Sequence, residues 1–330
     1  MELVSNYLWI NIILFVFGVV ILVKGSDWFV DAAAALARNF GVPELVIGLT
    51  LVSIGTSLPE LASSLCASFA GESNFIIGNI IGSNTANIAL ILGVGLLLGG
   101  SIGFSRVVLW RDMLFLLFLG IGLTIWYFCG VDAPEGADYG FGCIGGVILL
   151  LFCAVYSFVL CRSQDDSREQ ESVEDSRVKM SVLRASSMII LSLIMITCGA
   201  KFMVDTVVWS ARALGISELM ISLTIVAIGT SLPELAVTVS GVLKKREDIA
   251  LGNIIGSGIY NIILIIGACS VVSPLTGSGK SSLESMIIMN IVALILAIFM
   301  FAGKKIYRWQ GAIFVLMYAA FVAWSIICVK

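Results

Sequence analysis

Two glutamates stand at matched positions of the chain, each inside an apolar stretch long enough to cross a bilayer: Glu60 and Glu234. A carboxylate at membrane depth is costly, so a glutamate there indicates a functional site. Hydroxyl residues precede each glutamate at helical spacing. Before the first they are Ser53, Thr56 and Ser57, which stand seven, four and three positions earlier. Side chains at this spacing share one helix face, which predicts a cluster of oxygen ligands inside the membrane.

The second glutamate has nearly the same neighbours. Thr230 and Ser231 precede it at the same spacing, and Ala227 stands where the first copy has a serine. A proline comes directly before each glutamate and has no N–H, so the carbonyl four residues before the proline loses its helical hydrogen bond. A carbonyl freed at membrane depth needs a partner, and a cation is one.

A second block, G-N-I-I-G-S, follows each glutamate and adds further oxygens. Its glycines are four residues apart, a spacing that favours close helix packing. The candidate ligands here are Ser83 and Asn87 in the first copy and Ser257 and Asn261 in the second. The chain has no histidine, so the predicted ligands are all oxygens. Oxygen ligands suit hard cations such as Na⁺ and Ca²⁺ and disfavour Zn²⁺ or Cu⁺.

Both blocks belong to one internal repeat, in which residues 41–93 recur as 215–267 at an offset of 174 residues. Of its 53 aligned positions 27 are identical, so the match extends well beyond the two short motifs. The chain is 59% hydrophobic and only 12% charged, which predicts an all-α integral membrane protein. We expect ten transmembrane helices near 8–30, 44–69, 75–98, 112–130, 140–161, 183–209, 217–242, 249–272, 284–302 and 308–328.

A polar linker, residues 162–182, separates two five-helix halves, residues 1–161 and 183–330. Of the 19 basic residues, 14 fall in one alternating set of loops that includes this linker. Because positive charge gathers in cytoplasmic loops, we expect a cytoplasmic linker and both termini outside. The repeat offset contains five spans, an odd number, so the second half enters the membrane with opposite polarity. The sequence therefore predicts inverted repeats whose two glutamates meet near the midplane.

The paired G-T-S-L-P-E and G-N-I-I-G-S blocks resemble the two α-repeats of the sodium/calcium exchanger family, within the cation/calcium antiporters. The resemblance covers the whole chain, and the short linker resembles that of a compact prokaryotic member. It implies a Ca²⁺ site made by Thr56, Glu60, Thr230 and Glu234. It implies one flanking Na⁺ site from Ser53 (carbonyl), Ser57 and Ser83, and another from Ala227 (carbonyl), Ser231 and Ser257. Asn87 and Asn261 would line the middle.

The expected function is Na⁺/Ca²⁺ antiport across the cell (inner) membrane by alternating access. The ions are substrates, the lipid bilayer is the surrounding partner, and no cofactor or nucleic acid is expected. One chain holds the whole site, so a monomer suffices. The potassium-dependent relatives carry Asp where this chain has Asn261, so we expect no need for K⁺. A proton/calcium antiporter is the closest alternative, followed by a cation channel. An enzyme is disfavoured, since there is no histidine and the spans hold no paired aspartates.

Overall fold

The structure is a computed structural model that describes residues 8–133, 139–162, 180–213, 227–276 and 280–328. Most of these residues are helical, which confirms the predicted helical membrane protein. The elements of the first half are α1 (Leu8–Phe40), α2 (Glu44–Ile47), η1 (Gly48–Val52), α3 (Ser53–Thr56), α4 (Leu58–Phe69), α5 (Ser73–Ala86), η2 (Asn87–Leu92), α6 (Gly93–Gly99), β1 (Ser101–Gly103), η3 (Val108–Met113), α7 (Leu114–Cys129) and α8 (Cys143–Arg162). Those of the second half are α9 (Val182–Ala213), α11 (Ala227–Thr230), α12 (Leu232–Leu243), α13 (Glu247–Tyr260), η5 (Asn261–Ile266), α14 (Gly267–Val272), α15 (Lys280–Ala302), β2 (Lys305–Tyr307) and α16 (Arg308–Cys328).

Within the described ranges, seven helices are long and apolar enough to cross a membrane, and a bent pair makes an eighth candidate. The bent pair joins Glu44–Thr56 to Leu58–Phe69 at an angle of 46° and occupies the predicted span 44–69. Helix α16 lies where the span 308–328 was predicted. The predicted span 217–242 falls partly on residues 217–226, which lie outside the described part of the chain.

Helix α1 is longer than predicted. The sequence predicts a span that ends near residue 30, whereas the helix continues to Phe40. An alanine-rich run, Ala32–Ala37, is buried in this extension. Alanine is the strongest helix former, and its small side chain lets neighbouring helices approach closely. Asp31 and Arg38, beyond the predicted end, therefore lie on the same continuous helix.

The two copies of the repeat have the same local structure wherever both are described. Helices α4 and α12, helices α5 and α13, and the π-helical segments η2 and η5 each begin and end 174 residues apart. The helix breaks also match, at Ser57 (φ −85°, ψ 6°) and Ser231 (φ −91°, ψ 8°). In both copies the proline lies in the first turn after the break, where its missing N–H costs no hydrogen bond.

The last helix of each half packs on the other half. Helix α16 lies against α6, and α8 lies against α14. Strand β1 pairs antiparallel with β2 in a register that places Ile102 opposite Ile306, and Phe141 pairs with Leu275 in the same way. These contacts hold the two halves against each other around the centre of the molecule.

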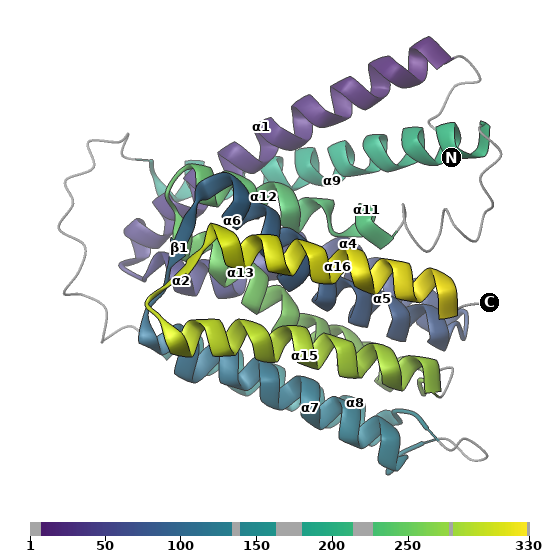
Figure 1. Ribbon diagram of the computed structural model, residues 1–330. Helices are drawn as coiled ribbons and strands as arrows, with labels where there is room; N and C mark the ends of the chain where they lie inside the picture. Colours follow the sequence, from purple (N-terminus) through teal and green to yellow (C-terminus); the bar gives the residue numbers. More distant parts are fainter. Residues whose placement is uncertain (1–7, 134–138, 163–179, 214–226, 277–279, 329–330) are drawn as a thin grey trace.

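The buried apolar side chains form two separate clusters. The larger one fills the bundle made by α5, α7, α13, α15 and their neighbours. The smaller one lies between α1 and α9 and reaches α12 through Val237. Figure 1 shows α1 and α9 side by side, apart from the layer formed by α7, α8 and α15. The pair therefore forms a distinct part of the fold.

One predicted close approach is confirmed in the second copy. A Cβ atom on Gly252 would lie 2.9 Å from the backbone nitrogen of Leu49, and one on Gly256 would lie 2.9 Å from the Leu49 carbonyl oxygen. Both distances are too short for a side chain, so these glycines let α13 pack directly on η1.

Gly71 tests the turn between α4 and α5. Its φ of +75° lies in the left-handed region, which costs other residues about 1 kcal/mol or more. We expect Gly71→Ala to lower the free energy of unfolding by about 1 kcal/mol. The control is Gly122→Ala, at an exposed position of α7, where alanine favours the helix. Thermal unfolding of the detergent-solubilised protein measures both, and equal stability of the two variants would contradict the argument.

Candidate functional site

The two predicted glutamates occupy equivalent places in the fold. Glu60 lies in the first turn of α4, and Glu234 lies in the first turn of α12. A helix N-terminus favours negative charge, and each break creates such an N-terminus inside the bundle. Both side chains are buried, with 1% and 2% exposure. The two turns meet at the junction of the halves, where Ser57, at the break before Glu60, contacts Glu234.

The hydrogen bonds of the two carboxylates are unequal. Oε1 of Glu234 accepts a hydrogen bond from the Ser57 hydroxyl at 3.0 Å, so this bond joins the two halves. The opposite bond, from Ser231 to Glu60, is not formed. Both carboxylate oxygens of Glu60 and the hydroxyl of Ser231 are buried without a hydrogen-bond partner. The Glu60 side therefore has the larger unsatisfied capacity for a cation.

Unsatisfied buried oxygens gather at the predicted site. Eleven buried side-chain nitrogen or oxygen atoms in the described part of the chain have no hydrogen-bond partner, and seven of them are oxygens of predicted ligands. These seven are both carboxylate oxygens of Glu60, Oε2 of Glu234, the hydroxyls of Ser83 and Ser231, and the amide oxygens of Asn87 and Asn261. Buried polar groups are normally paired, so a cluster of unpaired oxygens indicates a site for a cation.

Other predicted ligands already make protein contacts. The hydroxyl of Ser53 donates to the carbonyl of Gly48 at 2.7 Å and lies 3.1 Å from the Gly252 carbonyl. Its side chain therefore links η1 to α13, which leaves its backbone as the part able to reach an ion. The Ser257 hydroxyl donates to that Ser53 carbonyl at 3.4 Å. Ala227 and Thr230 begin and end α11, the short helix before the second break.

Asn253, the asparagine of the second G-N-I-I-G-S block, organises a predicted ligand, Thr56. Its amide oxygen accepts a hydrogen bond from the Thr56 hydroxyl at 3.0 Å. Its amide nitrogen donates to the Thr238 hydroxyl at 3.0 Å and to the Glu234 carbonyl at 3.3 Å. With the proton of Thr56 directed at Asn253, the lone pairs of that hydroxyl are free to face a cation. Asn253 is therefore a positioning residue.

Asn84 is a residue that the sequence reasoning missed. Its amide oxygen accepts a hydrogen bond from the Asn261 amide at 2.9 Å, and its own amide donates to the Gly258 carbonyl at 3.1 Å. This pairing commits the nitrogen of Asn261 and leaves its oxygen unpaired. Repeat matching could not identify Asn84, because the equivalent residue in the second copy is Gly258.

The donor set fits a hard cation. It consists of two carboxylates with hydroxyl and amide oxygens from both halves, at the junction of four broken or π-helical segments. The described residues contain no cluster of three or more His, Cys, Asp or Glu side chains that could hold a metal ion. Two negative charges balance one divalent cation, whereas the neutral oxygens suit monovalent ones. A helical membrane bundle with such a site at its centre belongs to the class of cation transporters.

Comparison with known proteins identifies the family. The sodium/calcium exchanger protein family matches residues 10–162 and 185–327, so the chain belongs to this family. The sodium/calcium exchanger MaX1 of Methanosarcina acetivorans is 35% identical over 95% of this chain and 97% of its own length. The inner membrane protein YrbG of Escherichia coli is 36% identical over 79% of each chain.

A solved structure has the same fold. The sodium–calcium exchanger NCX_Mj, in crystals soaked with zero Na⁺ and Ca²⁺, superimposes with a TM-score of 0.81 at 32% identity. The match covers 95% of this chain and 98% of that one. The predicted membership of the exchanger family is confirmed, as is the resemblance to a compact prokaryotic member. The family consists of membrane transporters, not enzymes.

Asn253→Ala tests the positioning of Thr56. The variant loses the acceptor that orients this hydroxyl, and each buried group left unpaired costs about 1–3 kcal/mol. We expect the affinity for Ca²⁺, measured by calorimetry on the purified protein, to fall about tenfold or more. The matched control is Asn290→Ala, which removes an amide that donates to Gly120 and Thr124 and to none of the predicted ligands. Equal losses in the two variants would refute the positioning role.

Proposed function

We propose that this chain exchanges Na⁺ for Ca²⁺ across the cell membrane by alternating access, at the site between α4 and α12. The observation that carries the proposal is the pair of buried, repeat-matched carboxylates, Glu60 and Glu234, surrounded by unpaired oxygens from both halves. Two adjacent charges in a site closed to water are costly unless a cation balances them. An empty site therefore cannot readily change sides, and one ion leaves only when another replaces it.

Alternating access follows from an inverted arrangement of ten spans. An odd number of predicted spans between the two copies reverses the second half in the membrane, and the matched bounds of α4 with α12 support a true structural repeat. By the distribution of basic residues, the linker at 162–182 faces the cytoplasm and both termini lie outside. Access to either side then corresponds to two related arrangements of one fold.

Ion assignments follow the ligand chemistry and the family resemblance. Glu60, Glu234 and the hydroxyls of Thr56 and Thr230 bind Ca²⁺. Na⁺ binds on one side through the carbonyl of Ser53 with Ser57 and Ser83. It binds on the other through the carbonyl of Ala227 with Ser231 and Ser257. Asn87 and Asn261 contribute amide oxygens at the middle. Since one chain contains the whole set, the monomer is the transport unit.

Neutralising either central carboxylate should abolish exchange. In Glu60→Gln or Glu234→Gln the site holds one charge against a divalent ion, and loss of one partner from a buried charge pair costs about 3–5 kcal/mol. We expect Na⁺-driven ⁴⁵Ca²⁺ uptake into proteoliposomes to fall about a hundredfold or more. Glu72→Gln, in the exposed turn before α5, is the control and should transport normally. Wild-type flux in either central variant would rule out the assignment.

The coupling ion is tested by imposing Na⁺, K⁺ and H⁺ gradients one at a time. With an amide at Asn261, the centre has two carboxylates and no third charge to balance an additional K⁺. We expect Na⁺ alone to drive Ca²⁺ uptake, at the same rate with or without K⁺. Uptake driven by a pH gradient without Na⁺ would instead identify a proton/calcium antiporter. Cation currents that need no counter-ion would identify a channel.

A further inference from the structure

Helix α1 packs on α9 along both of its halves, but only its C-terminal half is largely buried. Its N-terminal half exposes large apolar residues such as Trp9, Ile13 and Phe17, whereas Phe29 and the run Ala32–Ala37 are buried. Its extensive partner is α9, and it also packs on α12 and α2. The apolar cluster of the α1–α9 pair also includes Ile47 of α2 and Val237 of α12, so the contacts at this boundary hold the pair to the rest of the protein.

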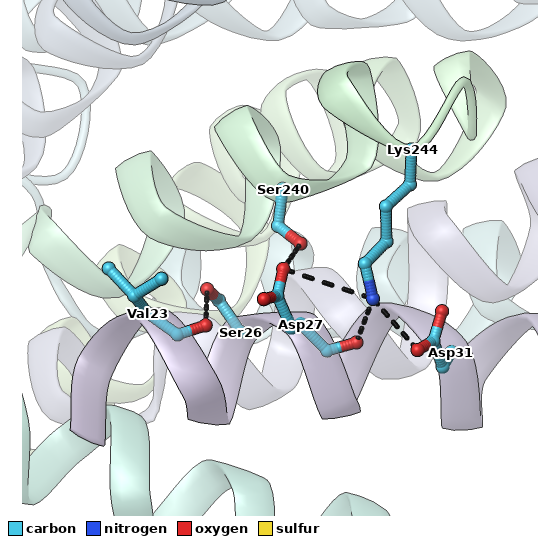
Figure 2. Close-up of polar contacts among 6 residues, drawn as sticks. All are labelled: Val23, Ser26, Asp27, Asp31, Ser240 and Lys244. Atoms are coloured by element: carbon cyan, nitrogen blue, oxygen red, sulfur yellow. Dashed lines mark hydrogen bonds and ion pairs between the residues drawn. The ribbon is translucent and has the colours of Figure 1, made fainter. Parts of the chain in front are cut away.

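The strongest polar contact across that boundary is made by Lys244, just after the end of α12 (Figure 2). Its ammonium group donates to the Asp27 carbonyl at 2.6 Å and to the Asp31 carboxylate at 2.8 Å. It also lies 3.8 Å from the Asp27 carboxylate, which in turn accepts a hydrogen bond from Ser240 at 2.7 Å. Figure 2 shows Ser240 and Lys244 reaching from one helix to both aspartates of α1.

The same turn holds a second element of the first half. Arg246 donates to the carboxylate of Glu44, at the start of α2, at 2.6 Å. Arg38, near the end of α1, lies 3.8 Å from the same carboxylate. Lys245, between the two basic residues, is exposed and has a φ of +58°. Backbone strain of this kind persists where the surrounding structure requires it.

The repeat provides an internal comparison. The equivalent turn after α4 has the same backbone hydrogen bonds: Glu72 N to Ala67 O, matched by Arg246 N to Gly241 O. Its residues are Ala70, Gly71 and Glu72, so Lys244 is replaced by a side chain that cannot bridge. On α9, the equivalents of Asp27 and Asp31 are Lys201 and Asp205, which pair with each other at 3.1 Å within the helix.

We propose that Lys244, with Asp27 and Asp31, is a one-sided ionic latch that holds α1 against α12 and so restricts access to the ion site from the end carrying the α12–α13 turn. Helix α12 runs from Glu234, in the site, to this turn, and α1 packs along it. An ion that leaves toward this end passes where α1 covers α12, so the latch must open for it to leave. The inference rests on the proposed alternating access.

The test compares Lys244→Gln with Lys245→Gln, which removes the same charge from the same turn but not the bridge. Hydrogen exchange, measured by mass spectrometry without ions, reports the opening of α1. We expect Lys244→Gln to speed exchange of residues 27–40 about three- to tenfold, the size expected for loss of a partly exposed ion pair, and Lys245→Gln to leave it unchanged. Equal exchange in both variants would overturn the latch.

A conservative variant separates a latch from local damage. Lys244→Arg keeps a positive charge and N–H donors facing Asp27 and Asp31, and should leave the exchange rate of α1 near the wild-type value. If the rate remained raised, the effect of Lys244→Gln would be disruption of the turn, and the proposal would fail.

Transport measurements keep this inference distinct from the proposed function. If the latch restricts one side, Lys244→Gln changes the apparent Ca²⁺ affinity from that side about threefold or more, while Lys245→Gln does not. Unchanged affinity in an active exchanger would overturn the latch alone. Absence of Na⁺-driven flux in the wild-type protein would overturn the proposed function, and the exchange rates of α1 would still decide whether the bridge holds the helix.

Discussion

The cost of keeping two carboxylates inside a membrane protein governs the central structure. Glu60 and Glu234 are tolerated because each begins a helix at a break, where backbone N–H groups favour negative charge. At each break, the serine of the repeated motif precedes the new helix and the proline lies in its first turn. The glycines at 252 and 256 then let α13 pack directly on the broken span, so that oxygens of both halves reach one place. Without the charge pair, these departures from regular helix would be only a loss of stability.

The two halves share backbone structure and most site residues, but their side-chain hydrogen bonds differ. Matched helices and breaks give the site its paired geometry. Within it, Ser57 donates a hydrogen bond to Glu234, whereas Ser231 makes no such bond to Glu60. Asn84 accepts a hydrogen bond from Asn261, and the second copy has a glycine in place of Asn84. The side-chain hydrogen bonds at the centre of the molecule are therefore not symmetric. Some ligand oxygens of the site already accept or donate hydrogen bonds, and others do not. Such unequal oxygens suit the binding of ions of different charge at neighbouring positions.

Much of this arrangement could be predicted from the sequence, because membrane burial limits what a residue can do. An intramembrane glutamate beside a proline implies a helix break, and one is present just before Glu60. Positioning residues were harder to predict. Asn253 and Asn84 act through partners about 175–200 residues away, and their roles depend on packing that periodicity does not encode. The predicted end of the first span was wrong for the same reason. The alanine run continues the helix because other helices bury it.

The contacts of Lys244 connect membrane orientation with the ion site. A turn with lysine, lysine and arginine carries the charge that favours the cytoplasmic side, and the equivalent turn of the other half, with alanine, glycine and glutamate, does not. A duplicated fold places these two turns at opposite ends of the bundle in the proposed orientation. The basic turn faces Asp27 and Asp31 on α1, whereas the corresponding charges on α9 neutralise each other. In that orientation, basic residues of the cytoplasmic turn also contact α1, so the two ends of the fold differ in their ionic contacts.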